Sequence, residues 1–197
     1  MAIIVDKEEK RRNIALSCRA LLLEHGIKNL TVSQIAQSAG IGKGTIYEYF
    51  SNKEDIVFEI IASFIAEHEQ RLQQIAQMDI PTKEKILSFY FLFFDDENSK
   101  HQLRTYREFL AISMTEPTEQ MVAFSQACNQ KFLAISEAIM QDAVDKGELR
   151  QEAVEIAKHL GIYHKGLIIE EQKSALPVKQ EIEKFLNTLF TLMEKKS

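Results

Sequence analysis

A short segment near the N-terminus carries polar side chains suited to contact with DNA. The run from Gly42 to Tyr49 holds a lysine, a threonine and two tyrosines. Lys43 can bring positive charge to a phosphate, and Thr45 can hydrogen-bond to a base edge or contact a thymine methyl group. Tyr47 offers a hydroxyl to a phosphate and a ring to the groove wall. These residue types predict a nucleic-acid contact surface.

Three further residues shape this predicted surface. Gly42 and Gly44 carry no Cβ, so the backbone at the start of the segment can approach a phosphate closely. Glu48 places a carboxylate in the same run, and DNA repels it unless it accepts a hydrogen bond from the cytosine amino group. Base reading and a solvated or ion-paired position both stay open for Glu48.

Two short helices must hold these side chains in place. Thr31 and Gln34 have the spacing of a capping box, which predicts a helix that begins at Val32. Gly40 then permits a sharp turn, because it has no Cβ to resist one. A further short helix follows over residues 43–49. Two short helices joined by a glycine-containing turn predict a helix-turn-helix.

The rest of the chain is expected to be helical too. It contains only 7 Gly and 3 Pro among 197 residues, together with many good helix formers, which predicts an all-α fold. Gly26 is expected to end the first helix, and Ser51 to cap the fourth, with Glu54 three residues on. We expect about nine helices, at residues 7–25, 32–39, 43–49, 52–77, 83–95, 101–113, 118–146, 152–172 and 178–195.

This helix pattern predicts two domains. Residues 1–52 would form a three-helix DNA-binding head that contains the helix-turn-helix. Residues 53–197 would form a helical ligand-binding and dimerisation domain, joined to the head by the long fourth helix. The last two helices carry two apolar stripes, which would form either the core of a monomer or an interface with a second copy: Ile156, Leu160, Tyr163, Leu167 and Ile168, and Ile182, Phe185, Leu189, Leu192 and Met193.

Aromatic residues crowd the middle of the chain. The stretch 89–94 is aromatic at nearly every position, so one helix face cannot bury them all. We expect an apolar pocket between the fourth and eighth helices, with a few polar groups that orient a ligand. Burial in the core is the alternative for each residue. The predicted ligand-binding residues are Phe64, Phe89, Phe93, Tyr106, Phe109, Phe124, Cys128 and His164.

The N-terminal motif resembles the TetR family of repressors. The run K-G-T-I-Y-x-Y-F from Lys43 to Phe50, followed by x-x-K-E at Lys53 and Glu54, carries most of the resemblance. It implies a homodimer whose two recognition helices lie about one DNA turn apart. Gly42 departs from the family, which often has serine there. The resemblance places Ser33, Gly42, Lys43, Gly44, Thr45, Tyr47, Tyr49 and Lys53 at or near double-stranded DNA.

We therefore expect a repressor that binds a palindromic operator and is released by a small, largely apolar effector. The alternative is a helix-turn-helix regulator that answers to a protein partner, or an activator that senses no small molecule. No nucleophile elbow, phosphate loop or zinc motif is visible in the sequence. We accordingly expect no enzymatic activity, no cofactor and no metal site.

Charge and hydropathy limit the other classes. The net charge is −5, but residues 1–55 carry eight Lys/Arg against seven Asp/Glu, and Lys7, Lys10, Arg11 and Arg12 cluster there. That is a weak electrostatic footprint for DNA. The longest apolar run, residues 86–94, is far shorter than the roughly 20 residues of a membrane span. The apolar start is too short for a signal peptide, so we expect a cytoplasmic protein with no membrane partner.

Overall fold

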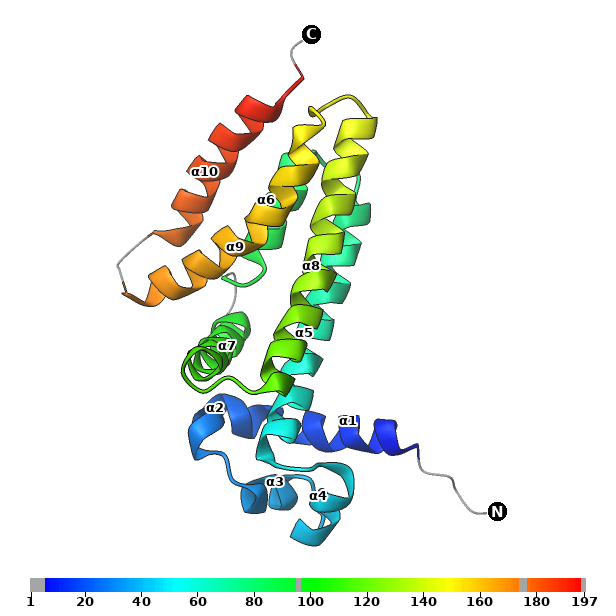
Figure 1. Cartoon of the computed structure of the whole chain (residues 1–197), viewed down its shortest axis with the longest axis vertical. Helices are drawn as coiled ribbons and strands as arrows, with labels where there is room; N and C mark the ends of the chain where they lie inside the picture. Colours follow the sequence, from blue (N-terminus) through cyan, green and yellow to red (C-terminus); the bar gives the residue numbers. More distant parts are fainter. Residues whose placement is uncertain (1–5, 95–96, 174–176, 196–197) are drawn as a thin grey trace. The chain divides into compact units, whose positions relative to one another are not determined.

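The computed structural model describes residues 6–94, 97–173 and 177–195. Within these ranges the chain forms ten α-helices and no strand beyond an isolated bridge between Leu149 and Glu194. The predicted all-α fold, with a helix-turn-helix head and a further helical domain, is confirmed (Figure 1). The helices are α1 (Lys7–Ser17), α2 (Arg19–Asn29), α3 (Val32–Ser38), α4 (Lys43–Tyr49), α5 (Lys53–Gln77), α6 (Thr82–Phe91), α7 (Glu97–Thr115), α8 (Glu119–Asp145), α9 (Glu152–Lys173) and α10 (Val178–Met193).

The first predicted helix is in fact two helices. It breaks at Cys18, where φ is −101° and ψ is 1°, and the Cys18 N–H donates to the Ala15 carbonyl at 3.0 Å. This break accounts for ten helices in place of about nine. Gly26 does interrupt the helical backbone as predicted, with φ at 75° and ψ at 173°. One more turn then follows as far as Asn29.

The two predicted helix caps differ in outcome. The capping box of α3 is confirmed, because the Gln34 N–H donates to Thr31 Oγ1 at 3.3 Å and the Gln34 side chain accepts from the Thr31 N–H at 2.9 Å. The cap predicted for α5 at Ser51 is wrong by one residue. Asn52 Oδ1 accepts from the Asp55 N–H at 2.7 Å, and Asp55 accepts from the Ser51 N–H at 3.0 Å. α5 begins one residue later than predicted because the side chains of Asn52 and Asp55 accept from the N–H groups at its start, and Asn and Asp cap a helix as well as Ser does.

The described helices pack into two compact units. The first, here called the head unit, comprises the chain up to Glu67 together with Arg104–Thr118. Its interior combines apolar faces from α1 to α5 and α7. The fully or almost fully buried side chains are Ile14, Cys18, Leu22, Leu30, Ile35, Ile46, Phe50, Ile56, Ile60 and Phe109.

The second, here called the body unit, comprises His68–Leu103 and Glu119–Ser197. In it α8 and α9 lie side by side, and α6 packs against α8 and α10 (Figure 1). The Tyr90 hydroxyl donates to the Leu160 carbonyl at 2.8 Å, which ties α6 to α9. Other completely or almost completely buried side chains of this unit are Leu72, Ile86, Met140, Ile182 and Leu186.

Two helices contribute residues to both units. The first part of α5 belongs to the head unit and its end to the body unit. The first part of α7 belongs to the body unit and the rest to the head unit. The return of residues 104–118 to the head unit has no counterpart in the predicted domains. The predicted boundary between residues 52 and 53 separates a DNA-binding domain from a ligand-binding domain, whereas the two units are defined by packing. That boundary stays a prediction.

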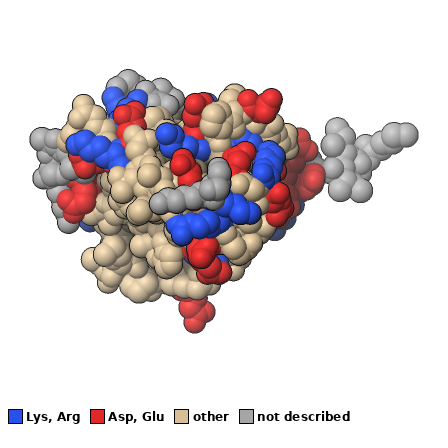
Figure 2. All heavy atoms as spheres, turned by 90° about the horizontal axis from the view of Figure 1, so that it is seen from above, with Lys and Arg blue, Asp and Glu red and all other residues tan. Residues whose placement is uncertain are grey.

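The surface of the body unit carries charges of both signs. Figure 2 shows Lys and Arg intermixed with Asp and Glu at the end of the unit where α8 passes into α9 and α10 terminates. Charges mixed in this way largely cancel one another's field at a distance. Across residues 6–94, 97–173 and 177–195, no helix is long and apolar enough to cross a membrane.

Candidate functional site

The helix-turn-helix of the head unit is built on a small buried face. Ile35 of α3 and Ile46 of α4 are completely buried, and Ala36 is 5% exposed. Gly40 makes the turn between the two helices with φ at +66°, in the left-handed region that favours glycine. Because the apolar faces of α3 and α4 are fixed inward, their other faces are fixed outward.

The outward face carries the side chains predicted to contact DNA. Tyr47 is 52% exposed although it is a large aromatic residue. Gly42 precedes α4 and offers no side-chain cap to that helix. Most of the eight predicted residues thus share one exposed surface on α3 and α4. Ser33, Gly42, Lys43, Gly44 and Tyr47 are exposed, and Thr45, Tyr49 and Lys53 are half-buried.

Lys53 has partners inside the protein. Its Nζ donates to the carbonyls of Ile27 and Lys28 at 3.2 and 3.4 Å. An ammonium group has three donors, so two are directed to the backbone here. The predicted phosphate contact of Lys53 stays a prediction, and the structure adds a second role that the sequence did not indicate.

Arg11 belongs to the basic cluster of the N-terminus, but its charge points into the head unit. It pairs with Asp55 at 3.0 Å and with Glu59 at 3.3 Å, and its guanidinium lies 4.5 Å from the centre of the Phe50 ring. It also donates to the carbonyl of Tyr49, the last residue of α4. Arg11 therefore ties the end of α4 to α5.

The acidic partner of Arg11 is electrostatically adapted to the pairing. Partial burial would by itself raise the pKa of Asp55, but hydrogen bonds from Arg11 and from the Ser51 N–H, with the Arg11 charge, lower that pKa below its usual range. Asp55 thus stays ionised at neutral pH. The spacing of Asp55 and Glu59, four residues apart on one helix face, is the one sequence signal that could have indicated a basic partner.

The eight predicted ligand-binding residues are divided between the two units. Phe64, Tyr106 and Phe109 lie in the head unit. Phe109 is 1% exposed and meets Phe58 edge-on at 6.0 Å, while the Arg19 guanidinium covers Phe64 at 4.4 Å. These contacts are those of core residues.

The other five lie in the body unit, where three of them come together. His164 of α9 meets Phe93 at 4.6 Å and Phe89 at 6.4 Å, measured between ring centres. Phe93 also meets His68 of α5 at 4.6 Å, so its ring contacts two imidazoles. Phe132 of α8 completes the group at 6.2 Å from both phenylalanines. We call these five residues the aromatic cluster.

One nitrogen in the aromatic cluster is of special interest. His164 is 8% exposed, and its Nε2 has no hydrogen-bond partner in the described part of the chain. Burial, together with the charges of His68 and Lys165, lowers the pKa of His164 to about 3, so the ring is neutral. A buried polar atom of this kind ordinarily has a partner. A polar group of a ligand is one group that could provide it.

Phe124 and Cys128 lie on α8 and are half-buried. Burial raises the pKa of the Cys128 thiol to about 11. Since the thiolate is the reactive form, Cys128 is a neutral, unreactive thiol at pH 7.

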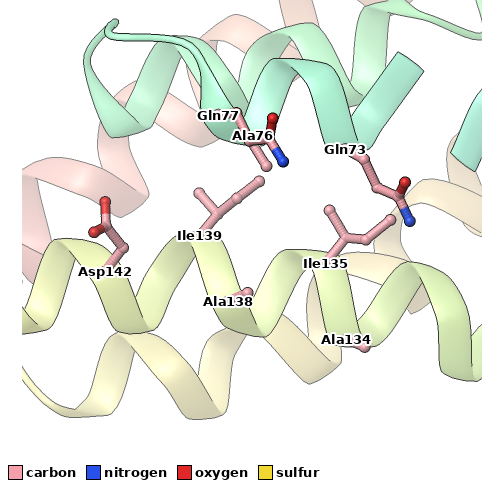
Figure 3. Close-up of a pocket in the computed structure, with 8 residues that line it drawn as sticks. All are labelled: Gln73, Ala76, Gln77, Ala134, Ile135, Ala138, Ile139 and Asp142. Atoms are coloured by element: carbon pink, nitrogen blue, oxygen red, sulfur yellow. The ribbon is translucent and has the colours of Figure 1, made fainter. Parts of the chain in front are cut away.

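A groove with a volume of 320 Å³ lies between α5 and α8 in the body unit (Figure 3). Ile135 and Ile139 point into it, and the Gln73 and Asp142 side chains stand at its margin (Figure 3). The eight predicted ligand-binding residues all lie elsewhere. The pocket predicted from the aromatic residues and this groove are therefore different places on the protein.

Comparison with known proteins places this architecture in a class. Residues 17–60 match the family described as bacterial regulatory proteins, tetR family. The match contains α3 and α4 with the exposed surface described above. The chain is therefore a DNA-binding transcriptional regulator. Its residues 17–60 are similar to the DNA-binding part of TetR-family regulators.

Relatives extend the likeness beyond the head. The chain is 25% identical over 148 residues to the fatty acid metabolism regulator protein of Bacillus subtilis, covering 74% of this chain and 73% of that protein. A TetR-family regulator from Cytophaga hutchinsonii has the same fold, with a TM-score of 0.78 at 16% identity over 98% of this chain and 99% of the other. These proteins are regulators rather than enzymes.

One solved structure holds a ligand of known chemistry. The regulator FadR from Bacillus subtilis, in complex with stearoyl-CoA, has a TM-score of 0.64 at 21% identity, covering 90% of this chain and 96% of that one. At this identity the likeness shows a shared fold.

Proposed function

We propose that the protein is a repressor that binds a palindromic operator as a homodimer in the bacterial cytoplasm and releases it when a small, largely apolar effector binds. The observation that carries the DNA-binding part is the outward face of α4, where Lys43 and Tyr47 are exposed while Ile46 between them in the sequence is buried. An exposed large aromatic residue beside a lysine suits contact with a groove wall and a phosphate.

The proposal of a homodimer rests on exposed apolar residues of the last two helices. Ile162 is 69% exposed, Leu192 is 63% exposed and Ile169 is 36% exposed. Of these three, only Leu192 belongs to the predicted stripes. Leu160 and Ile182 of those stripes are 3% and 0% exposed because they form the interior of the body unit itself. Large apolar residues left on a surface are common at interfaces between subunits.

The proposed effector site is the aromatic cluster. Its phenyl rings suit an apolar molecule, and the buried Nε2 of His164 suits one hydrogen-bonding group on that molecule. The stearoyl-CoA bound to FadR joins a long apolar chain to polar groups, which makes acyl-CoA esters the first compounds to test. Only an effector that binds better to the DNA-free form can cause release.

The DNA-binding part is tested with duplexes that the purified protein selects from a random-sequence pool. Fluorescence anisotropy across a salt series should show sequence-selective binding with a steep negative salt slope. Lys43→Ala should lower the magnitude of that slope by about 1 for each protomer, or about 2 for the dimer, and Tyr47→Ala should weaken binding to the selected duplex. Lys146→Ala, which removes an exposed lysine of the body unit, is the matched control. Selection of no sequence would overturn the proposal.

The effector part is tested by isothermal titration calorimetry with acyl-CoA esters of increasing chain length. We expect affinity to rise with chain length, because each buried CH2 contributes about 0.8 kcal/mol. His164→Leu should weaken binding, whereas His159→Leu, on the exposed side of α9, should not. Binding of no apolar compound would favour the alternative of a protein partner.

A further inference from the structure

The two residues after Gly26 have their backbone N–H groups bound by an acidic side chain and their carbonyl groups bound by a basic one. The N–H groups of Ile27 and Lys28 both donate to the carboxylate of Glu108 on α7, at 2.8 and 2.9 Å. The carbonyls of the same two residues accept from Lys53 Nζ at the start of α5. We call this arrangement the Glu108–Lys53 clamp. Hydrogen bonds with an ionised partner are roughly twice as strong as neutral ones.

The backbone at Gly26 is shaped for this clamp. Its φ of +75° with ψ of 173° lies in a region that is open almost only to glycine. A Cβ at position 26 would lie 2.7 Å from Glu108 Oε2, which is closer than carbon and oxygen can approach. The glycine thus turns two consecutive N–H groups toward one carboxylate and leaves room for it.

The clamped segment leads directly into the helix-turn-helix. Ile27 and Leu30 are buried, at 7% and 1% exposure, and Thr31 is the N-cap of α3. Four residues, Lys28 to Thr31, separate Ile27 from the start of α3 at Val32, and none of them is a glycine. The position of the clamped segment therefore sets where α3 begins, and α4 follows through the fixed turn at Gly40.

We propose that Glu108 is a positioning residue for DNA binding. It lies 81 residues after Ile27 and outside the segment 17–60 that matches the family, yet it holds the start of the helix-turn-helix in place. It acts through the backbone and contacts no DNA itself. The DNA-binding readout below rests on the proposed function, whereas the structural readout does not.

Hydrogen exchange tests the structural part in the full-length protein. In Glu108→Ala the amides of Ile27 and Lys28 should exchange at least about tenfold faster than in the wild type, because both lose their acceptor. Glu108→Gln keeps an acceptor oxygen without the charge and should be intermediate, which serves as the conservative variant if the alanine variant unfolds. Glu116→Gln, which removes an exposed carboxylate just beyond α7, should leave the two amides unchanged. Wild-type exchange at both amides in Glu108→Ala would overturn the proposal.

Anisotropy with a duplex selected by the wild type tests the functional part. Glu108→Ala should weaken binding about tenfold with an unchanged salt slope, since no phosphate contact is lost. An affinity equal to that of the wild type would overturn the positioning role. Lys53→Met should also weaken binding about tenfold with an unchanged salt slope. A slope reduced by about 2, one for each protomer of the dimer, would assign Lys53 to a phosphate contact and overturn a purely structural role for it. If the wild type selects no sequence, the proposed function fails, while hydrogen exchange still decides the clamp.

Discussion

The head unit and the body unit differ in the contacts around their proposed sites. In the head unit, charged side chains bind specific backbone groups and each other: Arg11 at the end of α4, and Glu108 and Lys53 at the segment before α3. In the body unit the centre is an aromatic cluster around His164, a neutral residue with an unpaired nitrogen. Directional hydrogen bonds fix a backbone in one place, whereas ring contacts tolerate many arrangements.

This difference matches what each unit is proposed to do. A DNA reader must hold α3 and α4 within a narrow range of positions, because base contacts depend on hydrogen-bond geometry. A ligand site must accept an added molecule without loss of its own folding, and aromatic side chains with few directional bonds allow that. The comparison therefore predicts that single charged residues dominate the stability of the head unit, and that an uncharged histidine dominates the pH response of the body unit.

The largest expected effect is that of Arg11→Ala. Its removal leaves Asp55 and Glu59 without their basic partner and frees the Tyr49 carbonyl, so we expect a loss of about 2–3 kcal/mol in the free energy of unfolding. Urea denaturation measures it. The neighbouring Arg12→Ala is the control, because Arg12 is exposed. Equal effects of the two substitutions would contradict the conclusion that the ion pairs of Arg11 stabilise the head unit.

Gly26→Ala is expected to be nearly as costly. A residue with a Cβ in this backbone region costs of order 1–3 kcal/mol, and the Cβ would also displace Glu108. Thermal unfolding followed by circular dichroism is suitable. Gly44→Ala provides the comparison, since no atom of the described chain lies within 4 Å of the added Cβ and alanine favours a helix interior by up to about 1 kcal/mol. A stabilising Gly26→Ala would show that the backbone there is not constrained as described.

Acidification should destabilise the body unit through His164. The folded pKa of His164 is lowered to about 3 by burial, with contributions from His68 and Lys165, while the unfolded chain keeps about 6.5. Below pH 6.5 the unfolded chain binds a proton that the folded chain excludes, so stability is lost as the pH falls from 6.5 toward 3. The loss is about 1.4 kcal/mol per pH unit, or about 2 kcal/mol at pH 5.

The same measurement in His164→Phe isolates this residue. Urea denaturation at pH 7 and pH 5 should show that the wild type loses about 2 kcal/mol more than the variant. His159→Phe changes an exposed histidine of the same helix and should keep the wild-type response. If the variant and the wild type respond equally to pH, the neutral buried state of His164 is wrong.

The smallest expected effect concerns the cap of α5. Asn52→Ala removes the acceptor for the Asp55 N–H and should cost about 1 kcal/mol. Ser51→Ala, at the residue predicted from sequence, should cost much less, because only its backbone N–H is used. Chemical denaturation of the two variants side by side compares them. A larger loss of stability in Ser51→Ala than in Asn52→Ala would show that Ser51 is the cap of α5.

Much of the helical fold could be predicted from local sequence signals. The capping box at Thr31, the glycine at 26 and the motif from Lys43 to Phe50 all act over a few residues, because caps and turns are made by neighbours in the chain. Helix boundaries after α2 were therefore predicted within a few residues. The shift of the α5 cap arose because Ser51 and Asn52 are both good caps, and local preference does not choose between them.

Partner choice over long distances came from the tertiary structure alone. Nothing local indicates that Glu108 binds the backbone of Ile27, or that Arg11 and Lys53, which read as basic residues available to DNA, bind groups of their own chain. Likewise, Phe64 and Phe93 look alike in the sequence as aromatic residues of predicted helices, yet one lies in the head unit and the other beside His164 in the body unit. Periodicity shows that a side chain will be buried, but which side chains meet depends on how distant helices pack, and that is a property of the whole chain.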